Sequence, residues 1–236
     1  MQNSVSWPPA YQVQRSLRAR RVRLRICRHR GLQITIPARF SFKRIPEVLQ
    51  ENKRWIEKNL LLYRVAEQSS SLPEAMDLQA IGEVWQISYQ ATENANLKLK
   101  QQAGNQLFVS GDLRDHDAIF RVLRRWLQKK AHLCLIPWLE KTSEITNLAY
   151  ERAVIRQAKT RWGSCSVLKC ISLNAKLLFL PPILVEHVMI HELCHTVHLD
   201  HSRRFWDLFA KFQADSRVLQ KKLRQAHFTL PTWLDA

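Results

Sequence analysis

Long hydrophobic runs are missing from this sequence of 236 residues. The most apolar stretch, LLFLPPILV at residues 177–185, is far shorter than the ~20 residues that a membrane-spanning helix needs, and two prolines interrupt it. The opening stretch MQNSVSWPPAYQVQR has no apolar core of a secretion signal. Cysteine is scarce and odd in number, with five in the chain. We therefore expect a cytoplasmic protein with reduced thiols and no transmembrane segment.

Acidic residues are also in short supply. The chain has 20 Asp and Glu against 37 Lys and Arg, which gives a formal net charge of +17. The excess is concentrated in residues 1–64, which carry 15 Lys and Arg but only 3 Glu. This balance suggests an acidic partner, and nucleic acid bound through the basic N-terminal region is the first candidate. A hydrophobic content of 46% indicates a folded globular protein.

The N-terminal residues show the two-residue period of β-strands. In RRVRLRIC, residues 20–27, apolar side chains alternate with arginines, and LQITIP, residues 32–37, resumes the alternation. The pattern predicts a hairpin with one buried face and one arginine-rich face. The arginines form either a solvated surface or a stripe that contacts phosphates. An amphipathic helix is expected next, over residues 46–62.

The rest of the chain alternates between short strands and helices. SSSLP at residues 69–73 is a candidate linker, and residues 78–110 predict two hairpins of a small sheet. A long helix is expected to begin after Asp115 as its N-cap and to end or bend at Pro137. Two strands and a helix over about residues 183–197 follow. We divide the chain into a β-rich basic region, residues 1–111, which includes one amphipathic helix, and a second domain, residues 112–236.

The predicted helix over residues 183–197 contains the pattern His-Glu-x-x-His, as HELCH at residues 191–195. Side chains four residues apart lie on one face of a helix, so His191 and His195 can bind one Zn²⁺ ion. Glu192 lies to the side of this face, where it can take a proton from the attacking water without being a ligand. Cys194 faces away and is expected in the core.

A catalytic zinc site needs a third protein ligand and an open position. His187 and His198 would extend a line of ligands along the helix axis, and a line cannot supply three corners of a tetrahedron. His201, six residues after His195, can return to the ion if the chain reverses, and Asp200 in a left-handed conformation is a candidate for that turn. Ser202 would then cap the next helix. The alternative ligands are two more distant carboxylates, Asp207 and Asp215.

Five stretches together resemble the YgjP-like metallopeptidase family. They are KTRWGSCS (159–166), ISLN (171–174), LPP (180–182), HELCH (191–195) and HLDHSRRFW (198–206). Their order and spacing match too, and the basic hairpin followed by ENKRWIEKNL is similar to the family's start. The family is similar to the SprT-like zincins. The resemblance implies an α+β fold with a zincin-like catalytic domain, in which a small antiparallel or mixed sheet packs on the HExxH helix.

The resemblance also implies site residues. It supports His191, His195 and His201 as zinc ligands and Glu192 as the base. The chain departs from the family's common pattern at Cys194 and Asp200, where members often have Ala and Asn. Asp200 would place a negative charge beside the third ligand, which could tighten metal binding or lower the Lewis acidity of the ion.

The segment KTRWGSCS suggests where a substrate binds. A hairpin just before the zinc helix can offer an exposed strand edge to an extended peptide. The candidate contacts are Trp162, Ser164 and Asn174. A role of Trp162 in the core, with Gly163 allowing a bulge, is an equally good interpretation.

Together these features predict a zinc-dependent metallopeptidase that hydrolyses peptide bonds with metal-activated water and Glu192 as general base. Its partners would be protein or peptide substrates and no membrane. One alternative is a nucleic-acid-binding protein with a structural zinc site, which the basic N-terminal region motivates. A protease that acts on DNA-bound proteins would combine the two.

Overall fold

The structure is a computed structural model that describes residues 7–27, 31–67, 72–92, 96–213 and 215–235. The chain forms two compact units, residues 1–70 and 71–236. The candidate linker at residues 69–73 falls at their junction, although residues 68–71 lie outside the described part. The division into domains at residue 111 stays a prediction. The contacts group the sheet formed by residues 75–111 with the second unit.

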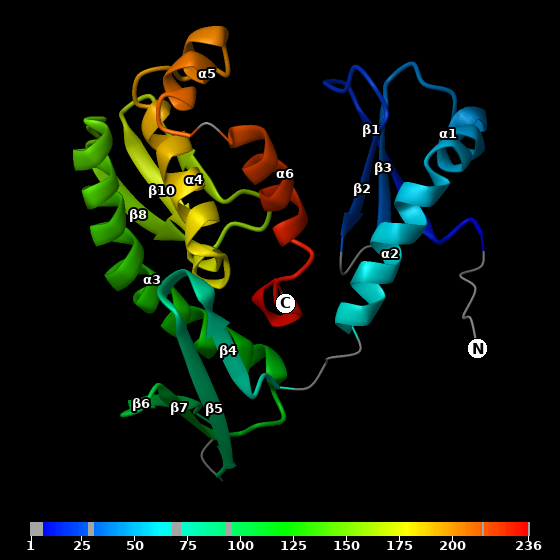
Figure 1. Ribbon diagram of the computed structural model, residues 1–236. Coiled ribbons are helices and arrows are strands. Elements are labelled where there is room, and N and C mark those ends of the chain that lie inside the picture. The colour runs from blue at the N-terminus through cyan, green and yellow to red at the C-terminus, as the bar shows by residue number, and fades with distance from the viewer. Residues whose placement is uncertain (1–6, 28–30, 68–71, 93–95, 214, 236) are drawn as a thin grey trace. The chain divides into compact units, whose positions relative to one another are not determined.

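The first unit is a three-stranded sheet covered on one face by helices (Figure 1). The sheet has the order β1-β3-β2, with β1 (Tyr11–Ser16), β2 (Arg23–Cys27) and β3 (Gly31–Pro37). Strands β2 and β3 pair antiparallel, as the predicted hairpin requires, and Leu32, Ile34 and Ile36 are fully buried while Arg23 and Arg25 are exposed. The apolar alternation therefore selects the buried face. Strand β1 adds to β3 in parallel.

The amphipathic segment over residues 46–62 forms two helices instead of one. Helix α1 (Ile45–Glu51) and helix α2 (Lys53–Glu67) are separated at Asn52, whose side-chain amide donates to the carbonyl of Val48 at 2.8 Å. Ile45, Leu49 and Ile56 are buried against the sheet, whereas Trp55 is 43% exposed. The backbone of Asn52, with φ −103° and ψ 12°, leaves the helical region, and this separates the two helices.

The second unit begins with a four-stranded sheet of order β4-β5-β7-β6. Its strands are β4 (Ala75–Leu78), β5 (Glu83–Ala91), β6 (Lys98–Gln102) and β7 (Gln106–Gly111). The pairs β4–β5 and β6–β7 are antiparallel, which confirms the two predicted hairpins. The hairpins join through a parallel pairing of β5 and β7, a non-local contact that the residue pattern does not reveal.

Helix α3 (His116–Thr146) runs alongside both sheets of the second unit (Figure 1). Asp115 caps it as predicted, because its Oδ1 accepts from the backbone N–H of Ala118 at 2.8 Å. The helix continues through Pro137, where an end or a bend was expected. Pro137 is exposed, while Leu135 and Leu139 beside it are fully buried. Core packing on both sides of the proline therefore holds the helix together.

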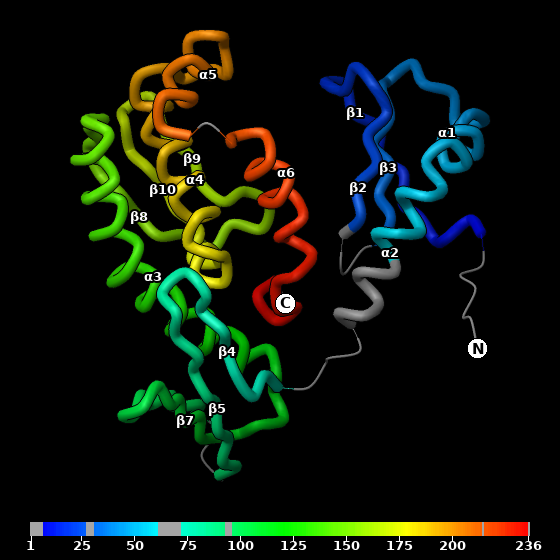
Figure 2. Tube along the Cα trace, viewed as in Figure 1, coloured from blue at the N-terminus to red at the C-terminus, as the bar shows by residue number. Residues whose placement is uncertain are grey.

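The remaining elements contain the stretches that resemble the metallopeptidase family. A second sheet has the order β8-β10-β9, with β8 (Arg152–Arg156), β9 (Gly163–Cys165) and β10 (Cys170–Asn174). Helix α4 (Pro182–Cys194) packs on β9 and β10, and α5 (Arg203–Ala210) and α6 (Ser216–Ala226) pack on α4. The Cα trace shows α4 in front of this sheet (Figure 2). The result is a mixed α/β fold with small mixed sheets, in agreement with the expected α+β class.

No helix in the described part of the chain is both long and apolar enough to cross a bilayer. Helix α4 is the most deeply buried helix of the site, because nine of its residues are buried. They are Leu184, Val185, His187, Val188, Met189, Ile190, Glu192, Leu193 and Cys194. Cys194 is fully buried, as expected from its side of the helix, and burial raises the pKa of its thiol to about 12.

Candidate metal centre

Two imidazoles of the site come from the last turn of α4. His191 is half-buried and His195, directly after the helix, is buried. Their Nε2 atoms lie 3.2 Å apart. This closeness follows from the helical spacing of four residues, which stacks the two side chains on one face.

The third imidazole arrives after the chain reverses. The Nε2 atom of His201 lies 3.2 Å from that of His191, and the three rings place ligand atoms within 4.8 Å of one another. The structure thus brings together the three histidines that the sequence singled out. In the described part of the chain, no other group of metal-binding side chains forms. Asp207 and Asp215 are not in the cluster.

The reversal itself differs from expectation. Asp200 does not have the left-handed backbone conformation that the sequence suggested. Asp200 acts through its side chain instead, because its Oδ1 accepts from the backbone N–H of Ser202 at 3.3 Å. Ser202 occupies the N-cap position of α5, but its hydroxyl makes no capping hydrogen bond. A side-chain-to-backbone turn therefore replaces the strained turn.

Aromatic side chains of α5 fix the orientation of the imidazoles. The ring of Phe205 is stacked on that of His195 at a centroid distance of 4.5 Å and lies 5.0 Å from the rings of His191 and His201. Phe205 is fully buried, so core packing holds its ring in place against the imidazoles. Trp206 lies 5.8 Å from His201. Sequence reasoning did not identify these aromatics as part of the site, although their position just after His201 is a signal for it.

A hydrogen bond outside the cluster fixes the tautomer of His195. Its Nδ1 lies 2.9 Å from the backbone carbonyl oxygen of His198, a pure acceptor, so Nδ1 carries the proton and donates it. The Nε2 lone pair then faces the other two rings. His198 therefore supports the site through its backbone and not through its ring. Such a partner cannot be read from side-chain types.

Two imidazoles of the cluster, those of His191 and His195, favour the neutral form. Burial and the proximity of His195 and His201 lower the pKa of His191 to about 3. Burial also lowers the pKa of His195, against the opposing hydrogen bond to His198. Metal ligation requires the deprotonated nitrogen, so these shifts keep the rings ready for a cation at neutral pH.

Glu192 is a buried carboxyl group beside the cluster. Its Oε2 has no hydrogen-bond partner among the described residues. Burial raises its pKa to about 8, while the charge of Arg161 acts in the opposite direction. A buried polar atom without a partner is costly, by about 1–3 kcal/mol, and marks a position that a water, substrate or ion completes.

Gly163 of strand β9 lies directly against this carboxyl group. A Cβ atom at Gly163 would come within 2.6 Å of Oε1 of Glu192 and 2.7 Å of its Cγ. The glycine is therefore required by close approach of the strand to the helix, not by a special backbone conformation. A bulge at Gly163, the interpretation considered from sequence, is not what the residue provides.

The residues fit a zinc ion. The Nε2 atoms of His195 and His201 each lie 3.2 Å from that of His191. Two ligands that are each ~2.0–2.1 Å from a tetrahedral zinc ion would be ~3.3 Å apart, so the observed distances match. All three candidate donors are imidazole nitrogens, which suit Zn²⁺. Glu192, the residue next to His191, has a buried carboxyl oxygen with no hydrogen-bond partner among the described residues. Three protein donors without a fourth are the pattern of a catalytic site.

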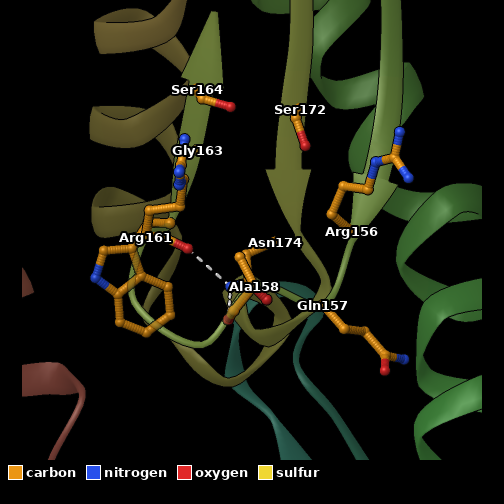
Figure 3. A pocket seen from close by; sticks show the side chains of 9 residues that line it. Arg156, Gln157, Ala158, Arg161, Gly163, Ser164, Ser172 and Asn174 are labelled. Carbon is orange, nitrogen blue, oxygen red and sulfur yellow. Dashed lines mark hydrogen bonds between the residues drawn. The ribbon is translucent and has the colours of Figure 1, made fainter.

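The three predicted substrate contacts lie together, lining a cavity of about 370 Å³ on the sheet (Figure 3). Trp162 is buried, donates from Nε1 to the carbonyl of Leu223 at 3.3 Å and stacks on His227 at 4.2 Å. The amide of Asn174 donates to the carbonyls of Ala158 and Arg161. Trp162 and Asn174 thus have internal partners, and their contact with substrate stays a prediction.

Comparison with known proteins identifies one family. The family model described as YgjP-like, metallopeptidase domain, matches residues 20–226, which is most of the chain. No curated protein and no solved structure matches the chain significantly.

The raised pKa of Glu192 predicts a pH-dependent stability of the metal-free protein. Folding raises the pKa of this carboxyl from 4.5 to about 8, so the folded state holds the proton more tightly. The free energy of unfolding should therefore fall as the pH rises through this range, by up to about 1.4 kcal/mol per pH unit.

Comparison with Glu192→Gln in the window from pH 7 to 8 isolates this group, because the histidines, whose unfolded pKa is 6.5, contribute equally to both proteins. Urea unfolding of chelator-treated protein in that window should show the slope, and Glu192→Gln should remove it. Equal slopes for the two proteins would refute the buried carboxyl.

Proposed function

The chain belongs to the YgjP-like metallopeptidase family, and from that premise we propose that it is a zinc-dependent peptidase in which His191, His195 and His201 hold the ion. The observation that carries the proposal is the convergence of the three ring nitrogens, together with the buried, unpartnered carboxyl oxygen of Glu192, the residue next to His191. When bound, zinc supplies Lewis-acid polarisation of the scissile carbonyl and lowers the pKa of its water from ~15.7 to about 7.

Glu192 is the general base in this proposal. Its carboxyl takes the proton from the attacking water and returns it to the leaving amine. The pKa of about 8 in the metal-free site places this group near neutrality, where a proton can be both accepted and released. A cation held by the three imidazoles would favour the carboxylate form that accepts the proton. The burial of Glu192 excludes competing water.

We place the substrate at the edge of β9. This strand is terminal in the order β8-β10-β9, so one of its edges is unpaired within the sheet, and its first residue, Gly163, touches Glu192. An extended peptide that adds to this edge through its backbone would pass the carboxyl group. Trp162 and Asn174 then position the chain that leads into β9. The backbone groups of Gly163 and Cys165, which alternate with those directed at β10, offer the pairing groups.

A structural zinc site in a nucleic-acid-binding protein is less well supported. Such a site normally has four filled protein ligands. In the described part of the chain, only three side chains converge. The open position favours hydrolysis. A protease that acts on DNA-bound proteins is compatible with this geometry, because it needs the same open site.

Replacement of Glu192 by Gln removes the base but keeps the shape of the side chain. We expect hydrolysis of an unfolded protein substrate to fall by about 10²–10⁴-fold. The zinc content, measured by mass spectrometry of the metal, should not change. Glu186→Gln, a half-buried position on the same helix, is the matched control and should retain activity. Wild-type hydrolysis by the Glu192 variant would exclude Glu192 as the base.

Replacement of His201 by Ala tests the third ligand. Loss of one of three donors should lower zinc affinity by at least about tenfold, since even losing an outer partner of a ligand costs 10–100-fold. Competition with a chromogenic chelator measures this change. His198→Ala is the control, because that residue acts through its backbone carbonyl, and it should bind zinc normally. Equal affinities in the two variants would return Asp207 and Asp215 to consideration.

Replacement of Gly163 by Ala tests the placement of Glu192. The new methyl group would overlap the carboxyl group and push it from its position. A displacement of about 1 Å can reduce catalysis by about 10²-fold, so kcat should fall by that order while zinc binding is retained. Ser172→Ala, on the neighbouring strand β10, is the control. Unchanged kcat in the Gly163 variant would show that the strand does not support the base.

A further inference from the structure

A groove of about 610 Å³ lies between α3 and strand β8, away from the metal cluster. Five of the nine residues that line it are Arg, Lys or His, and none is Asp or Glu. The five are Arg125, Lys129, His132, Arg152 and Arg156. All five are exposed at the surface. The groove is thus a concentrated positive surface on the peptidase unit, separate from the basic N-terminal residues.

The helix wall of the groove is set by helical spacing. Arg125, Lys129 and His132 occur at intervals of four and three residues, so they share one face of α3 and extend over ~10 Å. The opposite face of this helix is in the core, where Leu123 and Leu127 are buried. The buried stripe therefore fixes the direction in which the cationic side chains point.

The strand wall is set by the alternation of β8. Arg152 and Arg156 are four residues apart, so they lie on one face of the strand, ~13 Å from each other. Ile155 between them is buried on the other face. Helix and strand thus present two parallel rows of cations of similar length.

The positive surface continues across the sheet. Arg156 also lines the neighbouring 370 Å³ cavity, together with Arg161, Gln157, Ser164 and Ser172 (Figure 3). Ser164 and Ser172 are paired residues of β9 and β10. Gly163, adjacent to Ser164, faces Glu192, so by alternation Ser164 points to the opposite side of the sheet. The strand residues of the basic surface therefore lie on the face of the sheet opposite Glu192.

The charges of this groove are not neutralised within the protein. None of Arg125, Lys129, Arg152 and Arg156 takes part in an ion pair with a carboxylate of the described residues. The two cavities together offer guanidinium, ammonium, amide and hydroxyl donors and no carboxylate. This set of donors is the one that contacts phosphates and sugars in nucleic-acid complexes. A polyanion is the ligand that such a surface fits.

Two observations select the phosphate backbone over an acidic peptide. The side-chain amide of Gln128 donates to the carbonyl of Ile155 at 3.0 Å, so a helix side chain occupies this part of the β8 edge. A peptide could not add there as a strand. The groove also has no Phe, Tyr or Trp in its lining, so it has no platform for unstacked bases. A double-stranded partner, contacted only through its phosphates, matches these features.

We propose that the groove between α3 and β8 binds the backbone of double-stranded nucleic acid without sequence preference. Its length of ~13 Å corresponds to about four phosphates along one strand of B-form DNA, at 3.4 Å of helix rise each. This binding is separate from hydrolysis, because the groove and the metal cluster share no residue. A bound duplex would hold the peptidase unit beside proteins on that duplex.

The test is fluorescence anisotropy of a labelled 20-base-pair DNA duplex with the full chain at several salt concentrations. The variant Arg125→Gln with Lys129→Gln removes two groove cations. Each phosphate contact contributes a slope of about 0.9 to the dependence of log K on log salt, so the slope should become shallower by about 1.8. Relative to 1 M salt, this corresponds to a loss of affinity of about 60-fold at 0.1 M.

The matched control is Arg217→Gln with Lys221→Gln on α6, which removes one Arg and one Lys at the same spacing from exposed positions outside the groove. We expect it to weaken binding less than threefold. Equal losses of duplex affinity in the two double variants would overturn the proposal. It would also be overturned if the affinity of the wild-type chain for the duplex did not change with salt. Displacement of the duplex by an equal charge concentration of polyglutamate would also overturn it, because the groove would then serve an acidic peptide. Circular dichroism verifies that both variants are folded.

Discussion

The close approach of three imidazole nitrogens is the constraint on which the rest of the second unit depends. His191 and His195 meet because one helical turn separates them, and His201 meets them because the chain reverses and α5 packs back on α4. Phe205 closes the arrangement by contacting all three rings. The elements that pack on α4 hold the helix that carries His191 in place.

Burial of ionisable groups at the metal site costs free energy, and the large hydrophobic core of the second unit offsets this cost. Half-buried His191 and buried Glu192 both favour their neutral forms, with pKa values moved to about 3 and about 8. Each pKa unit corresponds to about 1.4 kcal/mol, so these two groups oppose their charged forms strongly. The packing of α4 on α3, β9 and β10 supplies the compensating hydrophobic burial. A site prepared in this way binds a cation with little rearrangement of its protein ligands.

Much of this organisation could be predicted from sequence, because it depends on local spacing. The alternation in residues 20–37, the hairpins of residues 78–110 and the helix that carries His191 are confirmed. The position of His201 followed from the geometry of a tetrahedron. Features that arise from tertiary contacts were missed. Core packing carries α3 through Pro137, backbone groups of His198 complete the site, and Gly163 is required by a helix that lies distant in sequence.

Anomalous diffraction at the zinc absorption edge, from a crystal of the full chain grown with the metal, would show which residues bind the ion. We expect one strong anomalous peak ~2.0–2.1 Å from the Nε2 atoms of His191, His195 and His201, with a solvent molecule as the fourth ligand. A peak held by other residues, or with four protein ligands and no solvent position, would contradict this expectation.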